Sequence, residues 1–158
     1  MNSQDATGAT GSRSAAAAPV PASPRAGDLG DVRLPSGPEM PHAARAAVHD
    51  WLDGRAPASV IQDAQLLVSE LVTNSCLHAG GANGAPVRIR AGRSNGSLWC
   101  EVGDAGRDGV VSRRVPSPVG DGGFGLHIVN LVAAQWGVTH GEGTEVWFTL
   151  ALPTADAA

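Results

Sequence analysis

Residues 66–81, which read LLVSELVTNSCLHAGG, decide the fold of this chain. The stretch is typical of a helix that ends at a pair of glycines, and it carries Glu70 and Asn74 four residues apart. Side chains at that spacing lie one above the other on a helix surface. The carboxylate and the amide are therefore predicted to share one flank of a single helix.

The helical period of about 100° per residue divides this helix into faces. The apolar side comprises Ala64, Leu67, Val68, Leu71 and Ser75. The predicted solvent side comprises Gln62, Gln65, Ser69, Thr73 and Cys76. Glu70 and Asn74 belong to neither side, because they lie beside Leu67 with Leu66 and Leu77 at their far edge. A buried charge without a partner is costly, so this arrangement favours a functional pair. The alternative is a surface glutamate and a helix-end asparagine.

Upstream of this helix, the sequence predicts a strand and a first helix. Residues 32–34 are predicted to form a short strand. Residues 38–53 are predicted to form a helix, because Pro38 and Glu39 are typical of a first helical turn. Ser59 is predicted to cap the central helix, with Gln62 three residues later.

Downstream, the hydrophobic period changes from helix to strand. Apolar and polar residues alternate over 87–92 and 97–104, on either side of the turn Ser94-Asn95-Gly96, which predicts a hairpin. The alternation directs Asp104 to the helix-covered side. A third helix is predicted to open at the glycine-rich residues 122–125, and two further strands at 136–139 and 144–152.

The order of strand, two helices, two strands, helix and two strands predicts an α+β fold. We expect a two-layer α/β sandwich in which helices cover one face of a mixed, largely antiparallel sheet. Residues 1–30 are rich in Ala, Gly, Pro and Ser and are predicted to be a disordered tail. The domain is predicted to span residues 31–153, followed by a short tail at 154–158.

Composition excludes several classes of function. The net charge of −4 argues against a general nucleic-acid binder. All 11 basic residues are arginine, so neither a P-loop lysine nor the lysine of an ordinary protein kinase is present. The two cysteines, one predicted in the middle of a helix and one in the middle of a strand, indicate a reduced cytoplasmic setting. No apolar run in the sequence is long enough to span a membrane.

Four polar features are predicted to converge. They are Glu70 with Asn74, Asp104 at a strand end, the glycine-rich helix start at residue 122, and Thr144 on an inward strand face. Free N–H groups at a helix start favour phosphate, and an amide oxygen suits Mg²⁺ that takes other ligands from phosphate. Each feature alone also has a structural explanation, such as a hairpin-end turn for Asp104.

Together these residues resemble the GHKL (Bergerat-fold) ATP-binding superfamily, and most closely its anti-sigma-factor serine/threonine kinase branch. The resemblance rests on SELVTNSCLHAG (69–80), VGDAG (102–106), GDGGFGLHIV (120–129) and GTEVWFTL (143–150), in this order. Between the second and third of these motifs, residues 107–121 would form an ATP lid.

The resemblance implies a role for each matching residue. Glu70 would be the general base, and Asn74 would hold Mg²⁺ that bridges the phosphates. Asp104 would accept the adenine amino group. The further nucleotide-binding residues would be Gly106, Gly122, Gly123, Gly125, Leu126 and Thr144.

The function that the resemblance implies is a cytoplasmic, ATP-binding and Mg²⁺-dependent serine/threonine protein kinase. It would phosphorylate an anti-anti-sigma factor of the STAS type and sequester a sigma factor, thereby regulating transcription. No direct contact with nucleic acid or membrane is expected, and a homodimer is left open. The alternative is a regulator that binds ATP and its partner but transfers no phosphate. A DNA-acting ATPase subunit is disfavoured, because the additional domain of such machines is not found in the sequence.

Overall fold

The computed structural model describes residues 27–78, 86–104, 124–140 and 144–154. Their elements follow the predicted order. They are β1 (Asp28–Leu34), α1 (Met40–Leu52), α2 (Ala58–His78), β2 (Val87–Ser94), β3 (Ser97–Asp104), α3 (Phe124–Val132), β4 (Gln135–His140) and β5 (Thr144–Ala151). The predicted α+β class is therefore confirmed.

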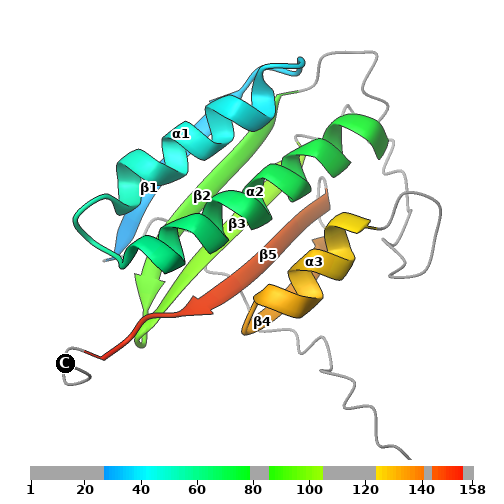
Figure 1. Cartoon of the computed structure of the whole chain (residues 1–158). Coiled ribbons are helices and arrows are strands. Elements are labelled where there is room, and N and C mark those ends of the chain that lie inside the picture. Colours follow the sequence, from blue (N-terminus) through cyan, green and yellow to red (C-terminus); the bar gives the residue numbers. More distant parts are fainter. Residues whose placement is uncertain (1–26, 79–85, 105–123, 141–143, 155–158) are drawn as a thin grey trace, which may run out of the picture.

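The five strands form one sheet in the order β1-β2-β3-β5-β4. Figure 1 shows all three helices on the same face of this sheet, which gives the predicted two layers. Each of the four strand pairings is antiparallel, so the parallel component expected of a mixed sheet is not found among the described strands. We call the face without helices the open face.

The β2–β3 hairpin forms where the sequence predicts it. Ser94 pairs with Ser97, which leaves Asn95 and Gly96 as a two-residue turn. Both turn residues have positive φ, 49° for Asn95 and 72° for Gly96. This is the geometry of a type I′ turn, whose twist matches that of the flanking strands, and Asn-Gly adopts it at little cost.

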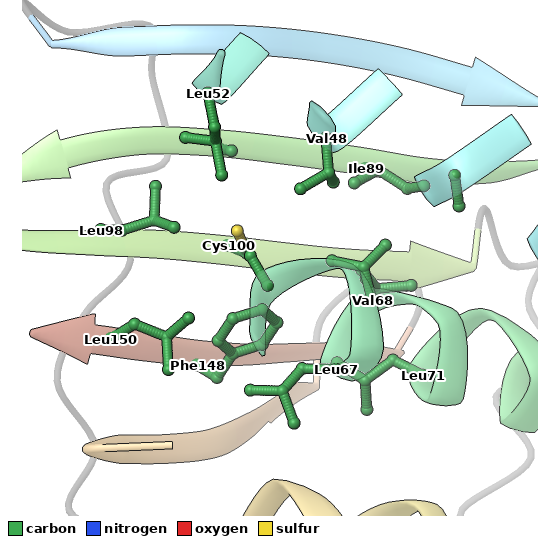
Figure 2. Close-up of a cluster of buried hydrophobic side chains, with 14 of the residues drawn as sticks. Val48, Leu52, Leu67, Val68, Leu71, Ile89, Leu98, Cys100, Phe148 and Leu150 are labelled. Atoms are coloured by element: carbon green, nitrogen blue, oxygen red, sulfur yellow. The ribbon is translucent and has the colours of Figure 1, made fainter. Parts of the chain in front are cut away.

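The hydrophobic core lies between α1, α2 and the helix-covered face of the sheet (Figure 2). Leu67, Val68 and Leu71 of α2 are buried, as the helical period predicts. They pack over Cys100 of β3 and Phe148 of β5. Burial of a large apolar side chain contributes about 1.5–3 kcal/mol, so this layer fixes the position of α2 on the sheet.

One flank of α2 that the sequence assigns to solvent instead contacts α1. Arg45 Nη1 of α1 donates a hydrogen bond to Ser69 Oγ (2.8 Å), and Gln65 Nε2 donates one to the carbonyl of Arg45 (3.1 Å). The helical period identifies polar positions but gives no information on which of them a neighbouring helix will cover. Leu66 also differs from expectation, because 41% of this large apolar residue is exposed.

Most element boundaries differ from the sequence prediction by one or two residues, and the starts of β1 and α2 are the informative differences. β1 begins at Asp28, so residues 28–30 of the predicted tail lie in a strand. A shift in the pairing register between Asp28 and Gly30 interrupts the strand period there, which is why the sequence pattern did not reveal these residues. α2 begins at Ala58, and the amide of Ile61 donates to the carbonyl of Pro57 (3.1 Å), so Ser59 lies inside the helix rather than at its cap.

Candidate functional site

The candidate site lies at one end of the sheet. Figure 1 shows the C-terminal end of α2, the end of β3, the start of α3 and the start of β5 together at this end. These are the four elements on which the sequence places its polar features. The fold therefore brings together segments that are up to about half the chain apart in sequence.

Glu70 and Asn74 are half-buried in the C-terminal part of α2. Their neighbour Ser69 faces α1, to which it is hydrogen-bonded. Residues at positions i and i+4 share a flank, so Glu70 and Asn74 lie together on the other side of the helix, where α3 is located (Figure 1). The buried Leu67 and Leu71 anchor this part of α2 to the sheet and thereby hold the polar flank in place.

Thr73 stabilises the same turn of α2. Its hydroxyl Oγ1 donates a hydrogen bond to the carbonyl of Ser69 (2.8 Å). The Thr73 side chain lies beside the Glu70–Asn74 flank, and this bond turns its hydroxyl back along the helix. The helix thus presents a carboxylate and an amide as the polar groups of that flank.

Asp104 and Thr144 occupy neighbouring strand ends. Gly103 pairs with Glu145, so the next position along both strands places Asp104 opposite Thr144. Two residues earlier on β3, Val102 is buried in the core, and strand residues two apart share a face. Both backbone positions therefore belong to the helix-covered face, as the alternation predicts. The side chains of Asp104 and Thr144 lie outside the described part of the structure.

The glycine-rich segment is only partly described. Gly125 and Leu126 belong to the first turn of α3, which begins at Phe124. The other three predicted glycines, Gly106, Gly122 and Gly123, lie outside the described residues, as does the predicted lid at 107–121. An α-helix start carries free N–H groups and a partial positive charge, so the start of α3 suits an anionic group beside the Glu70–Asn74 flank.

The site suits a metal ion that is shared with a ligand rather than one enclosed by protein. Among the residues that the structure describes, no group of three or more His, Cys, Asp or Glu side chains could hold a metal. Mg²⁺ is commonly bound by one or two protein oxygens, with water and substrate phosphates completing its six ligands. The half-buried amide of Asn74 fits that mode of binding.

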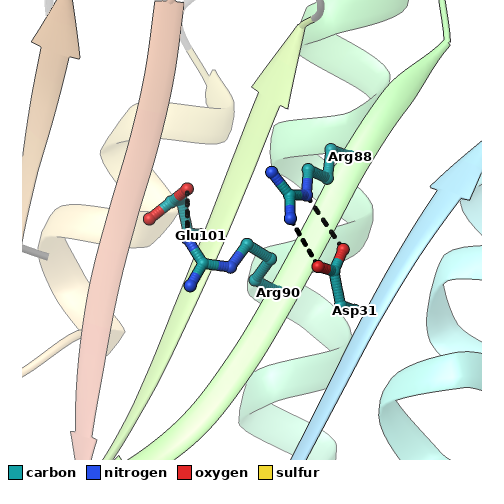
Figure 3. A network of polar contacts seen from close by, with 4 residues as sticks. All are labelled: Asp31, Arg88, Arg90 and Glu101. Atoms are coloured by element: carbon teal, nitrogen blue, oxygen red, sulfur yellow. Dashed lines mark hydrogen bonds and ion pairs between the residues drawn. The ribbon is translucent and has the colours of Figure 1, made fainter. Parts of the chain in front are cut away.

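Sequence reasoning missed the buried charges on the open face. Arg90 and Glu101 are only 7% and 4% exposed, although the strand alternation assigns them to solvent. Desolvation by burial, and after it the neighbouring Glu145, raise the pKa of Glu101 to about 7, although the positive charge of Arg90 acts to lower it (Figure 3). The signal that could have indicated this is the pair Trp99 and Trp147, which lie on the same face by the same alternation.

In the part of the chain that the structure describes, no helix has the length and apolar character needed to cross a membrane. A comparison with curated proteins found no match. A comparison with solved structures found the RsbU and RsbW domains of Rv1364c from Mycobacterium tuberculosis, with a TM-score of 0.58 and 22% sequence identity. The alignment covers 77% of this chain and 31% of that chain. At this identity, the likeness shows the fold alone.

The family assignment rests on the sequence of the domain itself. Residues 34–150 match the family described as the histidine kinase-like ATPase domain. The matched region begins at the end of β1 and runs to the end of β5, so it includes every element of the candidate site. This chain belongs to the histidine kinase-like ATPase domain family.

Proposed function

We propose that this protein is a Mg²⁺-dependent ATP-binding kinase that phosphorylates a serine or threonine of a partner protein. The observation that carries the proposal is the placement of Glu70 and Asn74 on one flank of α2, at the end of the sheet where β3 ends and α3 begins. An ATP-binding domain needs Asn74, Asp104 and the start of α3, whereas a carboxylate at position 70 is needed only for phosphate transfer to a hydroxyl or to water. The presence of Glu70 therefore supports a kinase rather than a protein that only binds ATP.

Each of the predicted site residues would have a separate role in ATP binding or phosphate transfer. Glu70 would accept the proton of the attacking hydroxyl. It lies one helical turn before Asn74, whose amide would face the phosphates. Asn74 would hold Mg²⁺, which neutralises phosphate charge when bound. Asp104 would accept a hydrogen bond from the adenine amino group. Because the chain has no lysine, the N–H groups at the start of α3 supply positive potential that a lysine provides in other nucleotide sites.

The partner that we propose is an anti-anti-sigma factor of the STAS type, and the protein would also sequester a sigma factor. The support is the resemblance of the four sequence motifs to the anti-sigma kinase branch, together with a fold similar to a structure that contains an RsbW domain. The second candidate function is a regulator that binds ATP and its partner without phosphate transfer. The two candidates differ in a single measurable step.

The test is transfer of labelled γ-phosphate from Mg-ATP to STAS-type proteins encoded in the same genome. Glu70→Gln keeps the size and hydrogen bonding of the side chain but removes the base. A positioned base contributes about 10²- to 10⁴-fold, so we expect transfer to fall by a factor in that range while ATP affinity is retained. Asp63→Asn is the matched control, because Asp63 is half-buried on the same helix two turns earlier and should leave transfer unchanged.

Two results would count against the kinase. Transfer by Glu70→Gln at the wild-type rate would refute the base assignment. Binding of ATP and partner by the wild-type protein, without any transfer, would establish the second candidate function instead.

A further inference from the structure

Two pairs of polar residues lie side by side on the C-terminal half of α2. Ser69 and Thr73 directly precede Glu70 and Asn74 in the sequence, so each pair spans one helical turn. Successive residues of a helix are about 100° apart around its axis, and the two pairs therefore face different neighbours. Ser69 faces α1, to which it is hydrogen-bonded, whereas Glu70 and Asn74 lie on the flank where α3 is located (Figure 1). A rotation of α2 about its axis moves both pairs together.

Ser69 is held at two of its atoms. Its hydroxyl Oγ accepts a hydrogen bond from Arg45 Nη1 of α1 (2.8 Å), and its carbonyl accepts one from Thr73 Oγ1 (2.8 Å). Serine and threonine are weaker helix formers than alanine, because their hydroxyls compete for backbone hydrogen bonds. Both positions before the site residues nevertheless carry a hydroxyl that is hydrogen-bonded. Helix formation alone does not account for that choice of residues.

The donor at Ser69 is a charged side chain. Arg45 is half-buried on α1. Within the described part of the chain, the ion pairs between arginine and a carboxylate are those of Arg88 and Arg90, so Ser69 Oγ is the acceptor that holds the Arg45 guanidinium. A hydrogen bond from a charged donor is stronger than one between neutral groups, and the planar guanidinium also restricts its direction. The bond therefore ties α1 to the residue that precedes Glu70.

This bond constrains a motion of α2 that its buried leucines control less closely. Leu67 and Leu71 pack in the core, and hydrophobic burial has no preferred direction. A hydrogen bond weakens steeply as its angle at the hydrogen departs from linear, so the bond to Ser69 opposes rotation of the helix about its axis. This rotation matters for a base that must reach one proton, because a misplacement of about 1 Å can cost about 10²-fold in rate.

We propose that Arg45 is a positioning residue for phosphate transfer. Through Ser69 it sets the rotation of α2 and thereby directs Glu70 toward the attacking hydroxyl, an inference that rests on the proposed kinase function. Arg45 acts through Ser69 and touches neither ATP nor the hydroxyl. ATP affinity should depend little on this bond, since Mg²⁺ takes most of its ligands from water and phosphate and can follow a small shift of Asn74. The rate of transfer, rather than ATP binding, should therefore respond when the bond is removed.

The experiment uses the full-length protein and the STAS-type protein that accepts phosphate from the wild type. It measures kcat for transfer at saturating acceptor, together with KM for ATP. Arg45→Met and Ser69→Ala each remove the bond, and each should lower kcat about tenfold with KM for ATP unchanged. The double variant should be no slower than either single variant, because both substitutions remove the same contact. Arg45→Lys restores a charged donor and should recover part of kcat.

Gln65→Met is the matched control, because it removes a second hydrogen bond between α1 and α2. Gln65 Nε2 donates to the carbonyl of Arg45 (3.1 Å), one helical turn before Ser69 and farther from the site. This variant should keep the wild-type kcat. Each of the three single variants loses one hydrogen bond between the helices, so thermal melts should show similar small decreases in melting temperature. A fall in kcat that is confined to the Arg45 and Ser69 variants therefore separates positioning from general stability.

Three results would overturn the inference and leave the kinase intact. The first is a wild-type kcat in both Arg45→Met and Ser69→Ala. The second is an equal fall in kcat in Gln65→Met, because the effect would then belong to helix packing in general. The third is a double variant whose loss is the product of the two single losses, since the two side chains would then act separately. A wild-type protein that binds ATP but transfers no phosphate would refute the kinase itself, and the inference with it.

Discussion

At the residue scale, the proposed role of Asn74 as the Mg²⁺ ligand can be tested with a single substitution. Asn74→Ala removes the one amide oxygen that fits Mg²⁺ on the polar flank of α2. We expect ATP binding in the presence of Mg²⁺ to weaken to the level seen with a chelator, while binding in the chelator is unchanged. Calorimetric titration of both proteins with and without Mg²⁺ measures this. Gln62→Ala, at an exposed position of the same helix, is the control.

Glu101 gives the protein a predicted dependence of stability on pH. Its pKa is raised from 4.5 to about 7 by desolvation and by Glu145, so the folded state holds a proton that the unfolded state releases. The free energy of unfolding should therefore fall as pH rises from about 5 to about 7, by about 3 kcal/mol at most.

Urea denaturation at pH 5 and pH 8 measures this loss of stability. Glu101→Gln should remove most of it, whereas Glu39→Gln, at an exposed site, should retain it. An unchanged pH dependence in Glu101→Gln would contradict the assignment. Asp31 acts in the opposite direction, because its hydrogen bond to Arg88 lowers its pKa and adds stability that is lost only in more acidic solution.

At the scale of single elements, α2 offers a comparison between adjacent leucines. Leu67 is fully buried, whereas Leu66 is 41% exposed. Leu67→Ala removes apolar contacts and leaves a cavity, so we expect a loss of about 2–5 kcal/mol in the free energy of unfolding. Leu66→Ala should cost about 0.5 kcal/mol or less, as is typical of surface substitutions. Chemical denaturation of both variants measures the difference, and equal losses would contradict the position of α2 on the sheet.

The elements also show what could be predicted from the sequence and what could not. The period of Leu67, Val68 and Leu71 and the Asn95-Gly96 turn are local signals, and the structure confirms the helix and the hairpin that they predict. The hydrogen bond from Arg45 to Ser69 depends on two separate helices, so no local pattern reveals it.

The same contrast between local signals and contacts between separate elements applies to the candidate site. Alternation along β3 is sufficient to place Asp104 on the helix-covered side, and the pairing of Gly103 with Glu145 then brings Thr144 opposite it. Alternation along a single strand does not reveal that Arg90 and Glu101 are buried, because their burial depends on neighbours from several strands. The roles of Gly106, Gly122 and Gly123 stay predictions, since these residues lie outside the described part of the chain.

At the scale of the whole molecule, the boundary of the domain is a further prediction. The carbonyl of Gly27 accepts a hydrogen bond from the amide of Arg93 (2.8 Å), and β1 begins at the next residue, so the domain should start at Gly27. A protein that begins there should melt within a few degrees of the full chain, because residues 1–26 are poor in large apolar side chains. A protein that begins at Asp31 removes part of β1 and should be less stable. Thermal melts followed by circular dichroism distinguish the two boundaries.

The central claim is that the end of the sheet near Asn74, Asp104 and the start of α3 binds ATP. The most direct measurement is calorimetric titration of the full-length protein with Mg-ATP and Mg-GTP, repeated with Asp104→Ala. Adenine carries an amino group where guanine carries a carbonyl, so a carboxylate at position 104 predicts tighter binding of ATP than of GTP. It also predicts that Asp104→Ala abolishes this preference. The absence of ATP binding, or equal affinity for the two nucleotides in the wild-type protein, would contradict the account.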